Sequence, residues 1–172
     1  MDAVQAIRER RSVRKFERRT ITPEVLRQLV DTACWAPSAG NMQTWRFVVV
    51  TDEKRLGKLR MVSPGLLGEP PAAIVVCQDL AACVEKMGEV MAPTIAAMDA
   101  ACAAYAITLA AHAEGLGTCI VASFNKAGVA RLLHLPAGVE PLLIVTAGHP
   151  ARIPAPPRRR TEGVCFLEAY DG

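Results

Sequence analysis

The sequence lacks the closely spaced cysteine pairs that build zinc knuckles or redox dithiols. Its six cysteines include no C-x-x-C pair, and this absence argues against both kinds of site. Most of them stand among apolar neighbours, where a free thiol behaves as a small hydrophobic group. We therefore expect reduced, structural cysteines, as is usual in the cytoplasm. The six are Cys34, Cys77, Cys83, Cys102, Cys119 and Cys165.

The sequence also lacks a strong charge imbalance and a long apolar run. Its formal net charge is only +3, which argues against a global nucleic-acid-binding role. The longest nearly apolar stretch, Ala100–Ala113, has 14 residues, whereas about 20 are needed to span a bilayer. The first residues contain no apolar secretory segment. We expect a cytoplasmic protein without nucleic-acid or membrane partners.

The 172 residues, 51% of them hydrophobic and 22% charged, suit one folded domain covering residues 1–172. Helical spacing and capping residues predict helices near Val4, after Thr22, after Asp52 and after Asn125. Helices and strands mix without strict alternation, which predicts an α+β fold with a small mixed sheet flanked by helices. The expected strands are Trp45–Val50, Ala73–Cys77, Thr118–Ala122, Leu142–Thr146 and an edge strand at Val164–Leu167.

The segment Pro93–Ala113 favours a long helix that is apolar on all sides. Ile95, Met98, Cys102 and Tyr105 lie on one stripe, and small alanines fill much of the remainder. A helix of this composition is buried all round. It is either a central core helix or a helix shared across a homodimer interface, and composition leaves both interpretations open.

Two clusters of basic residues stand at opposite ends of the chain. Seven of the twelve residues in Arg8–Arg19 are basic, with Ser12 among them. Arginines and a hydroxyl suit a phosphate monoester, although a solvated basic surface is an equal alternative. The second cluster is Arg158–Arg160, which alone is typical of a solvated tail.

The loop Trp35–Trp45 combines small residues with Ser38, Asn41 and Gln43 directly before a strand. Such a loop lets a flat ligand approach the backbone, but an ordinary turn has the same composition. No serine stands in a G-x-S-x-G elbow. The three histidines, His112, His134 and His149, show no metal-ligand spacing, so we expect structural roles for them and no metal site.

Taken together, these segments resemble the FMN-dependent nitroreductase family, over nearly the whole chain. The matching pieces, in order, are Arg10–Phe16, Ala36–Phe47, Ala110–Cys119, Leu133–Leu142, Ala147–Pro150 and Pro157–Arg160. The resemblance implies a nitroreductase-like fold, an interlocked homodimer and FMN sites at its interface. Thr44 stands where the family usually has proline, which predicts a less rigid loop before the strand.

The same resemblance implies the cofactor-binding residues. Arg10, Ser12 and Arg14 would line the FMN phosphate, ribityl chain and pyrimidine edge, with Arg11 contributing chiefly backbone. Arg158 and Arg160 would reach the phosphate. The ring contacts would come from Ala122 and Ser123, whose backbone faces flavin N5, and, from the other subunit, Pro37, Ser38, Ala39 and Asn41.

The implied activity is an FMN oxidoreductase that takes hydride from NAD(P)H onto N5 and reduces nitroaromatic, quinone or similar acceptors in a ping-pong order. The flavin carries the chemistry, so no catalytic side chain is expected. Three alternatives remain: the same fold with flavin fragmentation or dehalogenation chemistry, a non-catalytic flavin-storing dimer, and an anion- or nucleic-acid-binding module built on Arg8–Arg19.

Overall fold

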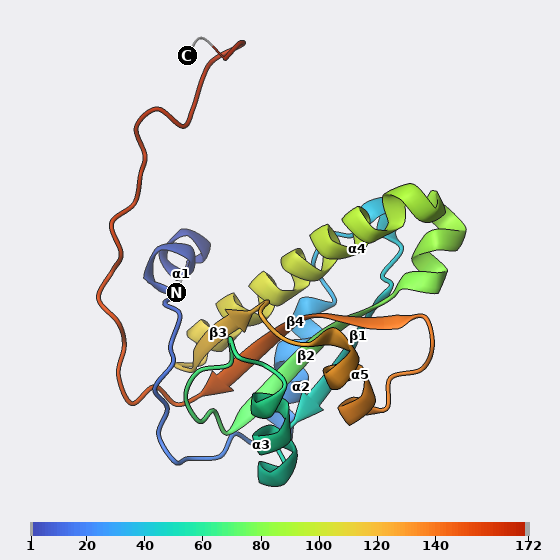
Figure 1. The fold of residues 1–172 in the computed structure, drawn as a ribbon. Helices are drawn as coiled ribbons and strands as arrows, with labels where there is room; N and C mark the ends of the chain where they lie inside the picture. The colour runs from blue at the N-terminus through green and yellow to red at the C-terminus, as the bar shows by residue number, and fades with distance from the viewer. Residues whose placement is uncertain (1, 171–172) are drawn as a thin grey trace.

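The protein is built around one four-stranded antiparallel sheet, seen in Figure 1. A computed structural model describes residues 2–170. The strand order is β1-β2-β4-β3, and every neighbouring pair is antiparallel. The expected α+β class is confirmed, but the sheet is antiparallel in its four strands instead of mixed. The bounds are β1 Trp45–Val50, β2 Ala72–Asp79, β3 Gly117–Val121 and β4 Val139–Gly148.

Helices cover both faces of this sheet, because side chains alternate along each strand. Ile74 and Val76 of β2 pack into a core with α2 (Pro23–Ala33) and α4 (Leu80–Ala113). Ala73 and Val75 point to the other face, where the core includes α3 (Glu53–Met61) and α5 (Lys126–Leu133). Since β2 is central and covered on both sides, its residues from Ala72 to Gln78 are all buried.

The helix starts follow the capping residues seen in the sequence. The side chains of Thr22, Asp52 and Asn125 accept backbone N–H groups at the starts of α2, α3 and α5. A further short helix, α1 (Ala3–Glu9), begins after Asp2, whose side chain accepts the N–H of Gln5 at 2.8 Å. Strand β1 has the expected bounds, and the other three expected core strands are present with ends shifted by one to three residues.

Helix α4 is longer than the expected Pro93–Ala113. It begins at Leu80 and turns at Gly88, whose φ of 75° and ψ of 161° are not helical. One face packs on the sheet through alanines and Ile107. The opposite face is open in the single chain: Met98 is 59% exposed and Tyr105 38%. Within residues 2–170, α4 is the one helix long and apolar enough to cross a membrane by length and composition.

The C-terminal tail leaves the body after β4. Pro150 forms a bridge with Phe16, and the N–H of Ala151 donates to the carbonyl of Lys15 at 3.0 Å. Every residue from 151 to 170 is exposed, and the tail runs away from the sheet in Figure 1. The expected edge strand at Val164–Leu167 was wrong for the single chain, because no strand lies beside this segment to pair with it.

Candidate functional site

The basic N-terminal segment lies along the free edge of β3. Ser12 forms a parallel bridge with Thr118, and the N–H of Val13 donates to the Thr118 carbonyl at 2.8 Å. Val13 is buried directly over Gly117. A Cβ on Gly117 would stand 2.7 Å from Val13 Cβ, so the close approach requires glycine there. This contact places the arginines on either side of Val13 at the sheet edge.

A cavity of about 310 Å³ lies between this segment and the end of α4. Arg10, Arg11, His112, Gly117 and Thr118 contribute to its walls. Both Arg10 Nε and His112 Nε2 are buried and have no hydrogen-bond partner among the described residues. Unpaired buried polar atoms are costly, so this wall is chemically incomplete and suits an anionic group.

Arg11 and Arg14, the two other arginines of this segment that were expected at the cofactor, are held differently. Arg11 donates through NH1 to the carbonyls of Arg8 at 2.7 Å and Arg10 at 2.9 Å, so its guanidinium is engaged with backbone. Arg14 is exposed and lies against the loop before β2. There Gly68 has a φ of +80°, and a Cβ on it would collide with the Arg14 carbonyl oxygen. The Arg14 guanidinium is exposed, and it donates to the Ser12 carbonyl at 3.5 Å beside this tightly packed backbone.

The loop Pro37–Asn41 is anchored on the middle of α4. The buried Asp99 carboxylate accepts the Ala39 N–H at 3.2 and 3.3 Å. Ser38 Oγ accepts the Gln43 N–H at 3.1 Å, and Asn41 Oδ1 accepts from Gln43 Nε2 at 3.0 Å. Asp99 and burial together also raise the pKa of Cys83, with burial the larger cause. These contacts hold the loop without burying Pro37, which stays exposed.

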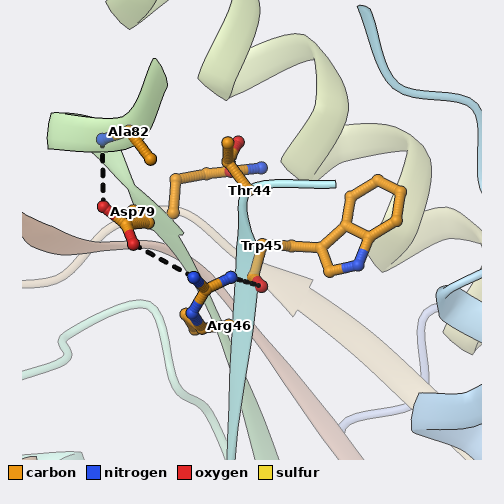
Figure 2. A network of polar contacts seen from close by, with 6 residues as sticks. Thr44, Trp45, Arg46, Asp79 and Ala82 are labelled. Carbon is orange, nitrogen blue, oxygen red and sulfur yellow. Dashed lines mark hydrogen bonds and ion pairs between the residues drawn. The ribbon is translucent and has the colours of Figure 1, made fainter. Parts of the chain in front are cut away.

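A polar network fixes the junction between this loop and β1 (Figure 2). The Thr44 hydroxyl donates to Gln78 Oε1 at 2.6 Å, and the Thr44 carbonyl accepts the Asp79 N–H at 2.8 Å. Arg46 donates to Asp79 Oδ2 at 3.0 Å, while Asp79 Oδ1 accepts the N–H of Ala82 at 3.1 Å. Hydrogen bonds therefore hold the backbone at Thr44, where the resemblance predicted a less rigid loop.

Ala122 and Ser123 follow β3 directly and are exposed. The Ser123 carbonyl accepts the Gly65 N–H at 3.0 Å, and a Cβ on Gly65 would lie 3.0 Å from both Ser123 Cβ and Ser123 O. The loop before β2 thus supports this short segment closely. Its backbone is held at the opposite end of β3 from the Arg10 cavity.

The single chain does not bring all of the expected site residues together. Asp99, which holds the 37–41 loop, and His112, at the Arg10 cavity, are thirteen residues apart on α4, or about 20 Å at 1.5 Å per residue. Arg158 and Arg160 lie in the exposed tail, in a hollow lined only by tail residues. The chain alone therefore supplies three separate parts: the Arg10 edge, the 37–41 loop and the tail.

Sequence reasoning missed two residues that shape these parts. His112 was expected to be structural; its Nε2 lies in the cavity wall and has no hydrogen-bond partner among residues 2–170. Asp99 received no role, although a carboxylate in an alanine-rich helix was a visible signal. Within residues 2–170, no three His, Cys, Asp or Glu side chains are grouped as a metal site.

Comparison with known proteins points to one family. The model described as "Nitroreductase family" matches residues 7–62 and 56–149. A putative NADH dehydrogenase/NAD(P)H nitroreductase of Methanothermobacter thermautotrophicus is 33% identical over 90% of this chain and 80% of its own. An FMN reductase (NADPH) of Bacillus subtilis is 26% identical over 99% of this chain and 75% of its own. A solved structure of an FMN-dependent nitroreductase from Clostridium difficile superimposes with a TM-score of 0.77 at 26% identity, covering 90% of this chain and 91% of that one.

Proposed function

The chain belongs to the nitroreductase family, and from that premise we propose that it is an FMN-dependent oxidoreductase using NAD(P)H, with residues 1–172 forming one flavin-binding domain. Relatives named as an NAD(P)H nitroreductase and an FMN reductase (NADPH) support the redox class and the nicotinamide donor. The acceptor would be a nitroaromatic, a quinone or a similar compound.

The observation that carries the cofactor assignment is the incomplete wall at Arg10. A phosphate dianion beside Arg10 would give the unpaired Nε an acceptor and would gain charge-assisted hydrogen bonds. Ser12, on the same edge, would bind the ribityl chain, with backbone groups of Arg11. Arg158 and Arg160 would close on the phosphate from the tail. The residues present therefore fit the group.

The chemistry that FMN supplies when bound is acceptance of hydride from NAD(P)H at N5 and delivery of electrons to the acceptor, in a ping-pong order. The protein's own part is positioning and charge. The exposed Arg14 guanidinium would face the pyrimidine edge, where a cation stabilises negative charge. The backbone N–H groups of Ala122 and Ser123 would face N5. In this arrangement no side chain transfers a proton.

A complete site requires a second copy of the chain. The 37–41 loop lies about 20 Å along α4 from the Arg10 cavity, so Pro37, Ser38, Ala39 and Asn41 would contact the flavin bound on the partner. The open face of α4 supports this arrangement, because Met98 and Tyr105 are exposed side chains of a strongly apolar helix. We place the protein in the cytoplasm as a homodimer, with this face covered by the second copy.

The homodimer can be tested with a pair of substitutions to glutamate. Met98→Glu should convert the dimer to monomer and lower flavin content, because the charge would be buried against a second α4. Met61→Glu is the matched control, since Met61 is 85% exposed and lies on α3, on the other side of the sheet. Light scattering during gel filtration measures the mass. A monomeric wild-type protein, or an M98E variant that remains dimeric, would contradict the proposed interface.

The flavin site can be tested by spectroscopy and titration. The protein as purified should be yellow, and NADH or NADPH added without oxygen should bleach it. Arg10→Ala and Arg160→Ala should each weaken FMN binding about 10- to 150-fold, which corresponds to one charge-assisted contact. Arg27→Ala is the control, because Arg27 forms only an exposed pair with Glu24. If both site variants keep wild-type affinity, the phosphate assignment is refuted. A yellow protein that does not bleach would be a flavin store.

A further inference from the structure

A second cationic hollow lies on the sheet face opposite α4, between α3 and α5. It has a volume of about 690 Å³, and the two helices pack against each other beside it (Figure 1). Lys54, Arg55, Lys58 and Arg131 line it, together with His134. We propose that this hollow, the α3–α5 groove, binds an organic phosphate that carries an apolar or aromatic body.

Among residues 2–170, the cations of the groove have no anionic partners. Lys54, Arg55, Lys58 and Arg131 form no ion pair with any described residue. The one acidic residue lining the groove is Asp52, and its carboxylate already accepts the Arg55 N–H at 2.8 Å as the cap of α3. The groove therefore presents an excess of positive charge, with four cations against the one carboxylate of Asp52, although the whole protein carries only +3.

The positions of the four cations along α3 and α5 are not all favourable for helix stability. Cations are favourable near the C-terminus of a helix and unfavourable near its N-terminus. Lys58 and Arg131 lie in the last turns of α3 and α5 and follow that rule. Lys54 and Arg55 are the second and third residues of α3, where the helix dipole opposes a positive charge. Two of the four cations are therefore unfavourable for the stability of α3, and a bound anion would offset this electrostatic cost.

The floor of the groove suits an apolar group. Val62 and Leu132 line it with Gly128 between the helices. A Cβ on Gly128 would lie 3.1 Å from Val62 Cγ1, so glycine at this position lets α5 approach the end of α3 closely. His134, the C-cap residue that follows α5, also lines the groove and has a left-handed φ of 53°. Cations around an apolar floor match a nucleotide-like molecule better than free phosphate.

The groove shares no lining residue with the Arg10 cavity, and neither Ala122 nor Ser123 lines it. The Arg10 cavity lies at the β3 edge beside the end of α4, whereas α3 and α5 cover the other face of the sheet. Binding at the groove can therefore be measured with the flavin site filled. Binding is measured by calorimetric titration of the protein with ADP and with pyrophosphate, in saturating FMN. The two probes share a diphosphate, and only ADP carries the additional adenosine group.

We expect ADP to bind, to bind more tightly than pyrophosphate, and to weaken as salt is raised. The double variant Lys58→Glu, Arg131→Glu should bind ADP at least about tenfold more weakly, because like charges then face the diphosphate. The control variant Arg27→Glu, Lys86→Glu carries the same net charge, with its changes on α2 and α4. It should match the wild type.

Three outcomes would overturn the proposal. They are the absence of ADP binding, equal affinities for ADP and pyrophosphate, and equal weakening in the groove and control variants. Flavin content and bleaching by NADPH are measured on the same samples. Because the groove variant should keep both at wild-type levels, failure at the groove is distinguished from failure of the proposed oxidoreductase function.

Discussion

The contact of Val13 with Gly117 offers a sharp test of how the sheet edge builds the proposed cofactor site. Gly117→Ala adds one methyl group at a position where Val13 Cβ and Cγ2 would be 2.7 Å away and Cγ1 2.8 Å away. Val13 cannot easily move, because it is β-branched, buried, and hydrogen-bonded to Thr118. The methyl group must therefore push the Arg10–Arg14 segment off β3.

Overpacking of this kind costs about 1–3 kcal/mol. For a chain of this length each kcal/mol lowers Tm by about 2–4 °C, so Gly117→Ala should lower Tm by about 2–12 °C. Gly57→Ala is the matched control: Gly57 lies inside α3, and its Cβ would meet nothing within 4 Å. That variant should gain about 0.5–1 kcal/mol, since alanine is the better helix former.

Thermal denaturation measures the Tm of both variants, and urea denaturation with and without FMN measures their unfolding free energies. Gly117→Ala should also bind FMN more weakly, because Ser12 and Arg14 flank the displaced valine. A double variant, Val13→Ala with Gly117→Ala, should be less destabilised than the sum of the two single changes, since the smaller side chain makes room for the new methyl group. Additive losses, or a Gly117→Ala protein as stable as Gly57→Ala, would refute the proposed packing.

Two further predictions concern buried ionisable groups. Asp99→Ala should lower the unfolding free energy by about 2 kcal/mol and speed hydrogen exchange at the Ala39 amide. Asp99→Asn keeps an acceptor for that amide and should lose less stability. An unchanged exchange rate in the Asp99→Ala variant would contradict the anchoring role. Burial raises the pKa of the Cys77 thiol from 9.0 to about 12, so the folded state holds this proton more tightly than the unfolded state. Its contribution to stability is complete below pH 9 and is lost as the pH rises toward 12. Urea denaturation across that interval should show a shallower decline for Cys77→Val than for the wild type, and identical slopes would refute the shift.

Features encoded by short-range interactions were predictable from the sequence. Thr22, Asp52 and Asn125 were expected to cap helices, and each accepts the expected backbone N–H. The apolar run of Trp45–Val50 became β1 with those bounds. A cap or a strand preference depends on neighbouring residues, so the linear pattern was sufficient.

Features that depend on distant residues were not predictable in this way. The strand order β1-β2-β4-β3 and the antiparallel pairing depend on contacts between segments far apart in the chain. Helix α4 begins at Leu80, before the non-helical Gly88, whereas the sequence pattern predicted a helix that begins only at Pro93. The apolar segment Val164–Leu167 forms no strand in the single chain, because a strand needs a hydrogen-bonding neighbour that composition does not specify.

The candidate site also combines features that the sequence predicted with features that only the tertiary structure decided. Residue types and their order along the chain determined the family, the α+β class and the list of expected cofactor residues, because those properties are carried by local motifs. Only the tertiary structure decided that Gly117 seats Val13 on β3, that Arg10 and His112 share one cavity, and that Asp99 holds the 37–41 loop about 20 Å away along α4. The physical reason is that a binding site is a set of distances between remote residues, and these exist only after the sheet and helices have packed.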